Sequence, residues 1–341
     1  MTLFDQLRTC LVQKKPFVAY VLPNSDVLTL GEQKSSKLHH FKGQDGFVFT
    51  SFLGTESVVI PFEDAVFNEL RYSKKHLQPI VNPKQKSDSE AGVFQRLVER
   101  AVHEIHSGNL EKVVVSRVIK SVFNEDCITA FENLIQRYHT AFRYLFYHPE
   151  VGGWMGATPE QLVQIKGKTF ETVALAGTYK GSLFKEWTSK EMHEQKMVTD
   201  YIVQTVAEFS SELDVSLPYT SEAGDLVHLK TNISGTLTSE KSGFDLVQSL
   251  HPTPAVCGLP KDRAVEFIMK NESYDRSFYT GFLGIKNEKR DEMNFFVNLR
   301  CLSFEGQNVN IYVGCGITGE SNPEAEFYET EHKSQTMIQI L

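Results

Sequence analysis

The side chains with the clearest chemical potential lie near the C-terminus, where a glycine-rich run at 314–319 leads into an expected helix. Glu326, Glu329 and Lys333 follow at spacings of three and four, which places two carboxylates and a cation on one helix face. Carboxylate oxygens are preferred ligands of Mg²⁺, and a lysine beside them can hold an anion. This face is typical of a site for a divalent metal and an anionic small molecule, although a charged, solvated helix face has the same pattern.

Two residues elsewhere could serve as a base and an acid. Lys112 lies in an expected valine-rich strand at 111–119, where partial removal from water can turn a lysine into a base. The alternative is a strand-edge lysine whose amine stays in solvent. Glu160 follows a turn of small residues, 156–159, which can fix one carboxylate as a general acid. That turn is also typical of a strand end that exposes the glutamate.

Three more side chains are candidates for binding. Glu194 stands near the apolar boundary of an expected helix at 188–210, where it could bind a metal or pair with Lys190 on the surface. His228 lies in an expected strand, as a catalytic group or as a core or edge residue. Arg300 ends an apolar strand, and its planar guanidinium suits a carboxylate, either of a ligand or of the protein.

Hydrophobic periodicity predicts the elements that must hold these residues. The expected helices are 90–106, 128–138, 188–210, 243–251 and 261–271, and the expected strands are 17–21, 46–50, 58–60, 111–119, 141–148, 162–166, 169–176, 226–237, 279–287, 293–304 and 308–316. The last two strands predict a hairpin through Glu305-Gly306-Gln307, and 79–89 has the composition of a linker. Many strands without strict alternation with helices predict an α+β sheet protein with its helices outside.

The bulk composition argues against several classes of function. The 341 residues carry a formal net charge of −8, which disfavours non-specific binding to nucleic acid or to anionic membranes. Five scattered cysteines without a C-x-x-C pair argue against a disulfide framework or structural zinc and fit a reducing cytoplasm. No apolar run reaches the roughly 20 residues of a membrane helix, and the N-terminus lacks the apolar core of a signal peptide.

Eight motifs stand in a particular order along the chain. They are Lys112-Val113-Val114-Val115-Ser116-Arg117, Gly156-Ala157-Thr158-Pro159-Glu160, Ala176-Gly177-Thr178, Glu194, His228-Leu229, His251-Pro252-Thr253-Pro254-Ala255-Val256, Arg276-Ser277-Phe278-Tyr279-Thr280-Gly281 and the run from Glu326 to Lys333. Together they resemble the chorismate-utilising enzyme family, from about residue 90 to the C-terminus. That family includes isochorismate synthases, salicylate synthases and the large subunits of anthranilate and aminodeoxychorismate synthases.

The resemblance implies an α+β fold with a large, largely antiparallel sheet core and outer helices. It implies 1–85 as a strand-rich N-terminal part of the same fold and 86–341 as the chorismate-binding catalytic region. It implies Mg²⁺ as the cofactor, with Glu194 and Glu329 as ligands and Glu326 near the metal. The residues that it implies for substrate binding are Gly177, His228, Ala255, Tyr279, Arg300, Gly314, Gly316 and Lys333.

Within the family, the segment 251–256 is most similar to isochorismate synthases. Salicylate synthases tend to have threonine where Ala255 stands, and the aminating branches usually read P-S-x-T there. We therefore expect an isochorismate synthase, with a salicylate synthase or an aminating anthranilate or aminodeoxychorismate synthase component as the alternatives. Lys112 would activate a water that attacks C2 of chorismate, and Glu160 would protonate the departing C4 hydroxyl.

Two departures from the family pattern lie close to the expected site. Gln195 stands where the family often has histidine, and Tyr179-Lys180 stand where Arg-Gly often follows Gly-Thr. Their effects stay open, as does any residual pyruvate-lyase activity. The pathway also stays open among menaquinone, siderophore and salicylate synthesis, with the short N-terminal region favouring menaquinone. We expect a cytoplasmic protein, and a monomer rather than an oligomer.

Overall fold

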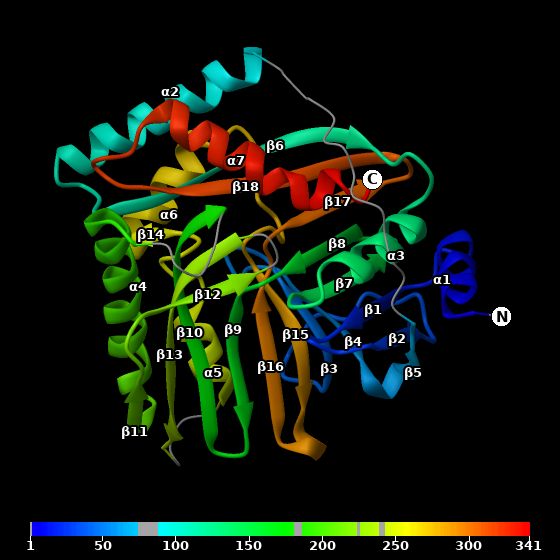
Figure 1. Ribbon diagram of the computed structural model, residues 1–341. Coiled ribbons are helices and arrows are strands. Elements are labelled where there is room, and N and C mark those ends of the chain that lie inside the picture. The colour runs from blue at the N-terminus through cyan, green and yellow to red at the C-terminus, as the bar shows by residue number, and fades with distance from the viewer. Residues whose placement is uncertain (1, 74–87, 181–185, 224–225, 239–242) are drawn as a thin grey trace.

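The computed structural model describes residues 2–73, 88–180, 186–223, 226–238 and 243–341. Within these ranges two nine-stranded sheets pack against each other, and every strand pairing that the sheets contain is antiparallel (Figure 1). Helices cover the outer faces of both sheets. The expected α+β class, with a large antiparallel sheet core and outer helices, is therefore confirmed.

The first sheet carries the long strand that begins at Lys112. In spatial order its strands are β14 (Gly258–Leu259), β6 (Lys112–Val122), β18 (Asn308–Ile317), β17 (Cys301–Glu305), β8 (Gly152–Thr158), β7 (Phe142–His148), β1 (Phe17–Val21), β2 (Val27–Gln33) and β5 (Ala65–Arg71). β6 and β18 pair over ten residues, with Gly316 opposite Val114 and Gly314 opposite Ser116. This register brings the glycine-rich run beside the valine-rich strand.

The second sheet carries the strand of His228. In spatial order its strands are β11 (Ser210–Val215), β13 (Leu226–Leu237), β10 (Thr169–Lys180), β9 (Gln161–Lys166), β16 (Glu292–Val297), β15 (Phe282–Asn287), β3 (Gly46–Thr50) and β4 (Ser57–Pro61), with β12 (Tyr219–Ala223) also paired to β13. Strands expected near 17–21, 46–50 and 58–60 are confirmed as β1, β3 and β4. β11 was not expected, because its exposed and largely polar residues give little strand signal.

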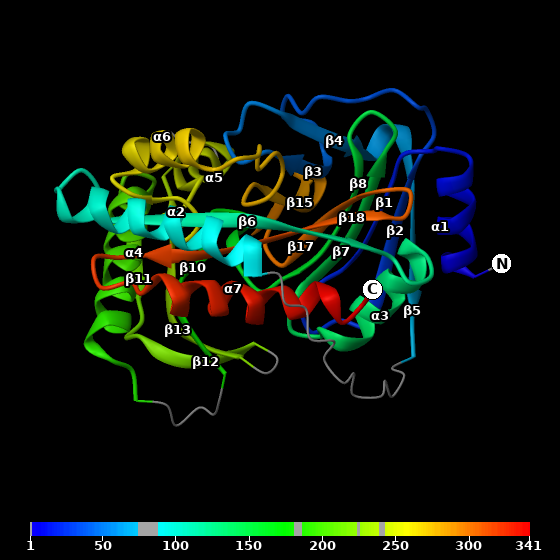
Figure 2. The ribbon, with the colours of Figure 1, turned by 90° about the horizontal axis from the view of Figure 1, so that it is seen from above.

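The helices α2 to α6 begin and end close to the positions that the periodicity predicts. They are α1 (Leu3–Val12), α2 (Asp88–His106), α3 (Cys127–Arg137), α4 (Ser189–Ala207), α5 (Gly243–Leu250), α6 (Lys261–Asn271) and α7 (Pro323–Ile338), with short 3₁₀ turns η1 (Phe62–Asp64) and η2 (Glu288–Arg290). Asn322 caps α7 by accepting hydrogen bonds from the backbone of Glu324 and Ala325. α2 and α7 lie side by side across β6 and β18 (Figure 2).

Four hydrophobic clusters hold the layers together. Aromatic rings fill the space between the sheets, where Phe142 of β7 stacks on Phe296 of β16 with 4.4 Å between centroids. Outside the first sheet the core includes α1 and α3, and outside the second it includes α4 and α5. A fourth cluster packs α2 and α6 onto β6 and β18. Burial of both faces explains why most strands are continuous apolar runs rather than alternating ones.

One expected strand is wrong. The run 293–304 is not a single strand, because β16 ends at Val297 in the second sheet and β17 begins at Cys301 in the first. Asn298 makes the break: its buried side chain accepts from the Tyr144 hydroxyl at 2.6 Å and donates to the Phe278 carbonyl at 2.8 Å. Only the second half of the expected hairpin forms, as β17 and β18.

A second crossing between the sheets lies beside the first. β8 ends at Thr158 in the first sheet, and after Pro159 and Glu160 the chain continues as β9 in the second. The two crossings are hydrogen-bonded to each other: Val297 N donates to Glu160 O at 2.9 Å, and Ala157 N donates to Arg300 O at 3.0 Å. Glu160 and Arg300 are therefore both held at the junction of the sheets.

The N-terminal strands extend both sheets, since β1, β2 and β5 join the first and β3 and β4 join the second. The expected boundary between 85 and 86, and most of the expected linker 79–89, fall outside the described residues. The helix α1 was not expected. Its apolar residues Leu3, Leu7 and Cys10 are buried on one face, but the helix is too short for this pattern to stand out in the sequence.

Candidate active site

A pocket of about 240 Å³ is lined by residues of both sheets and of the helices α4 and α7. Its walls include twelve of the thirteen predicted site residues: Lys112, Glu160, Glu194, His228, Ala255, Tyr279, Arg300, Gly314, Gly316, Glu326, Glu329 and Lys333. The thirteenth, Gly177, belongs to β10, but its surroundings lie outside what the structure describes. Residues spread over more than two hundred positions thus meet in one cavity.

Lys112 is 1% exposed and extends from the start of β6 into this pocket. Its Nζ donates to Oε1 of Glu194 at 2.7 Å, so its amine is not in solvent as the alternative interpretation required. Lys190, the alternative partner of Glu194 on the surface, has a side chain that lies outside the described part of the structure. The amine of Lys112 is therefore held in the pocket by a carboxylate from another element.

Gly316 explains how the pair fits against the sheet. A Cβ atom at this position would lie 2.9 Å from Glu194 Oε1 and 3.0 Å from Lys112 Cε. Any larger residue would therefore push the pair off the strand. The requirement for glycine here comes from space and not from backbone conformation.

Glu160 is 7% exposed and lines the same pocket. Burial raises the pKa of its carboxyl from 4.5 to about 7, against the opposing effect of the cations Lys112, Lys333 and Arg300. Its backbone N–H donates to Thr158 Oγ1 at 3.2 Å, which fixes the turn after Pro159. A carboxyl group that keeps its proton near neutral pH can act as a general acid.

Arg300 brings an unsatisfied cation to the pocket. Its backbone has φ 47°, in the left-handed region that non-glycine residues rarely adopt, as the crossing from β16 to β17 requires. The Nη1 atom is buried and has no hydrogen-bond partner among the described residues. Burial also lowers the pKa of the guanidinium. A buried donor of this kind needs an anionic acceptor, which a bound carboxylate can supply.

Tyr279 and Gly314 form the wall between Arg300 and α7. The Tyr279 ring stacks on Tyr312 with 5.3 Å between centroids, and burial raises the pKa of its hydroxyl. A Cβ at Gly314 would meet the Tyr279 hydroxyl at 2.9 Å and the Val115 carbonyl at 2.7 Å. The glycine therefore lets the tyrosine lie against the strand.

The face of α7 that carries Glu326, Glu329 and Lys333 turns toward the pocket. Glu326 is buried, Glu329 is partly exposed, and Lys333 donates from Nζ to Gly314 O at 3.0 Å. The same amine lies 2.6 Å from Glu329 Oε1. The alternative of a solvated charged face is wrong for this helix, because all three side chains line the cavity.

His228 and Ala255 complete the predicted set. His228 projects from β13 and is buried at the pocket wall. Ala255 lies in the turn after His251, whose Nε2 is 2.9 Å from the Phe52 carbonyl oxygen. Burial lowers the pKa of His251 to about 4, so this histidine is neutral and structural near pH 7.

Glu191 is a pocket residue that the sequence reasoning missed. It lies in the first turn of α4, where its Oε2 accepts from the backbone N–H of Thr188 at 2.8 Å. Its spacing of three from Glu194 is the signal that could have found it, since residues at i and i+3 share a helix face. Thr280 was also missed, although it belongs to a quoted motif; its φ of 60° is unusual for a β-branched residue.

Four carboxylates therefore line the pocket from two helices: Glu191 and Glu194 on α4, and Glu326 and Glu329 on α7. Hard oxygen donors of this kind fit Mg²⁺. Within the described residues no three acidic, histidine or cysteine side chains converge as a preformed metal group. Glu194 and Glu329 instead each hold a lysine amine, so the donor chemistry fits a metal while the present arrangement pairs the donors with protein cations.

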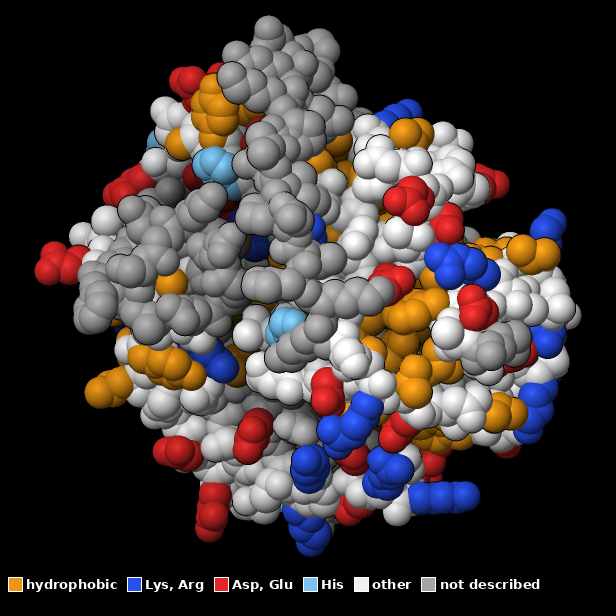
Figure 3. Space-filling model, turned by 45° about the vertical axis from the view of Figure 1, so that its right-hand side comes forward, with side chains coloured by type: hydrophobic (Ala, Val, Ile, Leu, Met, Phe, Trp, Pro, Cys, Tyr) orange, Lys and Arg blue, Asp and Glu red, His pale blue; other side chains and the backbone are white. Residues whose placement is uncertain are grey.

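Features outside the pocket bear on the remaining expectations. All five cysteines are free and buried. Each helix in the described ranges is too short or too polar to cross a membrane. On the face seen in Figure 3, acidic and basic side chains are interspersed.

Comparison with known proteins gives a consistent result. A family model described as "Chorismate binding enzyme" matches residues 62–341. The chain is 30% identical over 265 residues to the protein named isochorismate synthase EntC of Escherichia coli K12, which covers 74% of this chain and 67% of that protein. It is 29% identical over 291 residues to isochorismate synthase DhbC of Bacillus subtilis, covering 78% of this chain and 70% of that one.

The fold agrees with this result. The solved structure of a DhbC protein from Bacillus anthracis superposes with a TM-score of 0.80 at 25% identity, covering 96% of each chain. The match therefore includes the N-terminal strands as well as the region that carries the pocket.

Proposed function

The chain belongs to the chorismate binding enzyme family, and from this we propose that it is an isochorismate synthase, a Mg²⁺-dependent isomerase that converts chorismate reversibly to isochorismate. The observation that carries the proposal is the meeting of Lys112 and Glu160 in one pocket, both buried, with the orphaned donor of Arg300 beside them. A base, an acid and an anion-binding cation are what the reaction requires.

We assign the binding of the substrate to Arg300 and Lys333, which line one pocket. Arg300 would hold one carboxylate of chorismate through its buried Nη1, and Lys333 would hold another beside Gly314. Tyr279 and His228 would orient the ring, and Ala255 leaves space next to it. We also carry Gly177 forward as a backbone contact. These roles follow the family resemblance and the lining of the pocket.

The acid and base steps are assigned to two side chains. Lys112 would accept a proton from a water as the water oxygen bonds to C2 of the ring. The ring double bonds shift, the C4–O bond breaks, and Glu160 donates its proton so that the C4 hydroxyl leaves as water. The bonds made and broken are alike, so the reaction is reversible. For this step Lys112 must be in its neutral form, which can donate one N–H to Glu194 and accept the proton of the water on its lone pair.

Glu194 and Glu329 would hold Mg²⁺, with Glu326 and Glu191 beside it. A bound Mg²⁺ supplies positive charge that polarises a substrate carboxylate and stabilises charge building on it. The chain's own contribution is to present carboxylates from α4 and α7 on opposite sides of one cavity. The metal would also replace the amines of Lys112 and Lys333 as the partners of Glu194 and Glu329.

The deciding experiment is incubation of the protein with chorismate, with and without Mg²⁺, and identification of the product by chromatography. We expect isochorismate, formed only with the metal. Release of salicylate and pyruvate would assign a salicylate synthase, and an amino product formed with ammonium would assign an aminating component. Either outcome overturns the proposal.

Two further expectations belong with the proposed function. A monomer predicts elution near 38.7 kDa in size-exclusion chromatography. A cytoplasmic location fits the reduced state of the five buried cysteines.

A further inference from the structure

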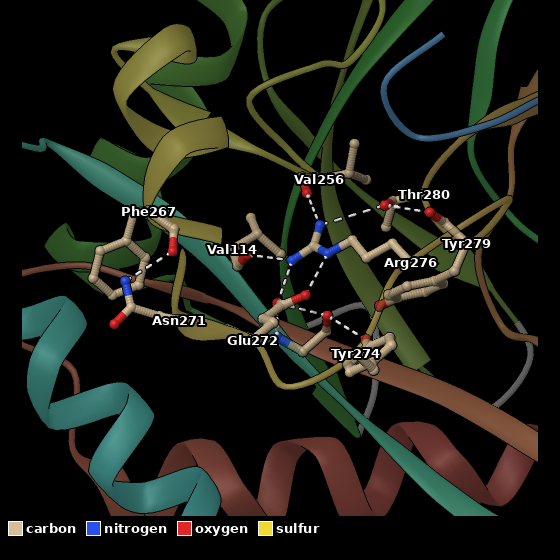
Figure 4. Close-up of polar contacts among 10 residues, drawn as sticks. Val114, Val256, Phe267, Asn271, Glu272, Tyr274, Arg276, Tyr279 and Thr280 are labelled. Atoms are coloured by element: carbon tan, nitrogen blue, oxygen red, sulfur yellow. Dashed lines mark hydrogen bonds and ion pairs between the residues drawn. The ribbon is translucent and has the colours of Figure 1, made fainter. Parts of the chain in front are cut away.

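Arg276 lies directly behind the pocket wall, 3% exposed, between α6 and Tyr279 (Figure 4). Its guanidinium carries five N–H donors, and all five have acceptors. Two go to Glu272, from Nε at 2.8 Å and from Nη2 at 2.6 Å. The other three go to the Val114 carbonyl at 2.7 Å, the Val256 carbonyl at 3.0 Å and Thr280 Oγ1 at 3.3 Å.

The three acceptors outside Glu272 share one property: their residues all line the pocket, whereas Arg276 does not. They belong to three segments that are distant in sequence. Val114 lies two residues after Lys112, Val256 follows Ala255, and Thr280 follows Tyr279. One side chain therefore ties together the strand of the proposed base and two segments of the substrate wall.

Glu272, the ion-pair partner of Arg276, also binds β6, the strand of Lys112 and Val114. Its Oε1 accepts from the Ser116 backbone N–H at 2.7 Å and from Ser116 Oγ at 2.8 Å. At this edge β6 pairs with β14 only at Lys112 and Val113. Beyond that point no strand in the described part of the chain pairs with the Val114 carbonyl or the Ser116 N–H, and these two groups bond to Arg276 and Glu272 instead.

Burial of the pair is not explained by stability alone. A buried ion pair is often no more stabilising than apolar residues of the same size, because both charges lose their hydration. This pair is almost wholly buried, with side-chain exposures of 2% and 1%. What apolar residues could not supply is a set of directed hydrogen bonds to three separate segments.

We propose that Arg276 and Glu272 are positioning residues, which hold Lys112, Ala255 and Tyr279 in register across the pocket without touching the substrate. The kinetic part of this inference rests on the proposed function. Misplacement of a reacting group by about 1 Å can cost about 10²-fold in rate. Loss of the pair should therefore lower kcat far more than it changes KM.

The test compares Arg276→Lys with wild-type enzyme. Lysine keeps the charge but has three donors instead of five, so it cannot serve Glu272 and all three wall acceptors. We expect kcat to fall about 10²-fold and at least tenfold, with KM for chorismate changed less than threefold. Crystal structures of the two proteins should show Lys112, Ala255 or Tyr279 displaced in the variant.

A matched control removes another buried cation. Lys286 is 4% exposed, lies 3.1 Å from Asp45 and does not line the pocket. Lys286→Met should lower the melting temperature and leave kcat unchanged. Wild-type kcat in a folded Arg276→Lys protein would overturn the proposal. If that variant does not fold, Glu272→Gln takes its place, and then Ser116→Ala; an unchanged kcat there also counts against it.

The outcome is separable from that of the proposed function. The wild-type product of chorismate is identified first. If it is not isochorismate, the proposed function fails, while the crystal structures still decide the role of Arg276. Unmoved Lys112, Ala255 and Tyr279 in the variant structure would overturn the positioning role whatever the reaction is.

Discussion

Lys112 and Glu194, 82 positions apart in the chain, share a hydrogen bond of 2.7 Å on the floor of the pocket. One comes from the first residue of β6 and the other from the second turn of α4. The proposed base and a proposed metal ligand are thus direct partners. Whatever binds Glu194 also changes the surroundings of Lys112.

Lys112→Ala should abolish turnover while chorismate still binds in the presence of Mg²⁺. A general base contributes about 10²–10⁴-fold, so kcat should fall by at least about 10². Steady-state kinetics and calorimetry with chorismate measure the two quantities. Lys120→Ala, at an exposed position of the same strand, is the control and should behave as wild type. Near-full activity of Lys112→Ala would refute its role as base.

The pH dependence of kcat/KM should follow the protonation of the Glu160 carboxyl. Because burial raises the pKa of Glu160 to about 7, its acid form is present below that pH and is lost above it. We expect kcat/KM to decline above about pH 7, and Glu160→Gln to be inactive at every pH. A flat profile between pH 6 and pH 9, measured with saturating Mg²⁺, is the contrary result.

Glu160 should also affect stability, with a sign that can be worked out. The folded protein binds this proton more tightly than the unfolded chain, since the pKa rises from 4.5 to about 7. Wild-type stability therefore falls as the pH rises through this interval, by about 3 kcal/mol. Glu160→Gln does not titrate, so its unfolding free energy relative to wild type should increase by about that amount between pH 4 and pH 8. Urea unfolding at both pH values measures it.

Arg300→Lys should weaken substrate capture. Lysine keeps the charge but loses the planar fork, and a hydrogen bond to a charged group contributes about 1.5–3 kcal/mol. We expect kcat/KM for chorismate to fall about 10- to 100-fold, mostly through KM. Arg290→Lys, at an exposed position in η2, serves as the control. Equal kcat/KM in the two variants would exclude Arg300 as a carboxylate ligand.

Gly316→Ala tests the space beside the Lys112–Glu194 pair. The new methyl group would lie 2.9 Å from Glu194 Oε1, so the pair must move and turnover should fall at least tenfold. Gly92→Ala is the matched control, because its Cβ would meet only the Arg96 Nη1 atom at 3.5 Å. In a helix that change should be neutral or stabilising. Full activity of Gly316→Ala would show that the pair tolerates displacement.

Removal of the metal should show which carboxylates act by binding Mg²⁺. Chelation with EDTA should abolish turnover, and added Mg²⁺ should restore it. Glu194→Gln and Glu329→Gln should raise the Mg²⁺ concentration needed for half-maximal rate at least tenfold. Glu305→Gln, exposed at the end of β17, should not. If the rate is the same with and without EDTA, the proposed cofactor is wrong.

Twelve of the residues predicted from the sequence line the pocket, whereas Glu191, Thr280 and the pairing of side chains within the pocket were not predicted. Lys112 and Glu160 each have a local signal, a lysine among valines and a carboxylate after a small-residue turn. The contact between Lys112 and Glu194 has no such signal, because it depends on how α4, which packs on β10 and β13, is placed relative to β6. Sequence periodicity describes one element at a time and carries no information on such contacts.

The missed break at Asn298 has a similar cause. The run from Phe295 to Leu302 is apolar except for Asn298 and Arg300, and two isolated polar residues do not end a strand in a pattern of this kind. Asn298 ends it through two buried partners, Tyr144 and Phe278, which belong to other parts of the chain. Two of the five acceptors of Arg276, the Val114 and Val256 carbonyls, are likewise distant in the sequence, so the sequence marks Arg276 only as part of a motif.

The two crossings between the sheets connect two residues of the site rigidly. Glu160 and Arg300 lie on neighbouring backbone segments that are joined by the Val297 N–Glu160 O and Ala157 N–Arg300 O hydrogen bonds. These two hydrogen bonds hold the backbones of Arg300 and Glu160 in a fixed relation to each other. Under the proposed roles, the residue that binds the carboxylate and the residue that donates the proton therefore share one rigid backbone junction.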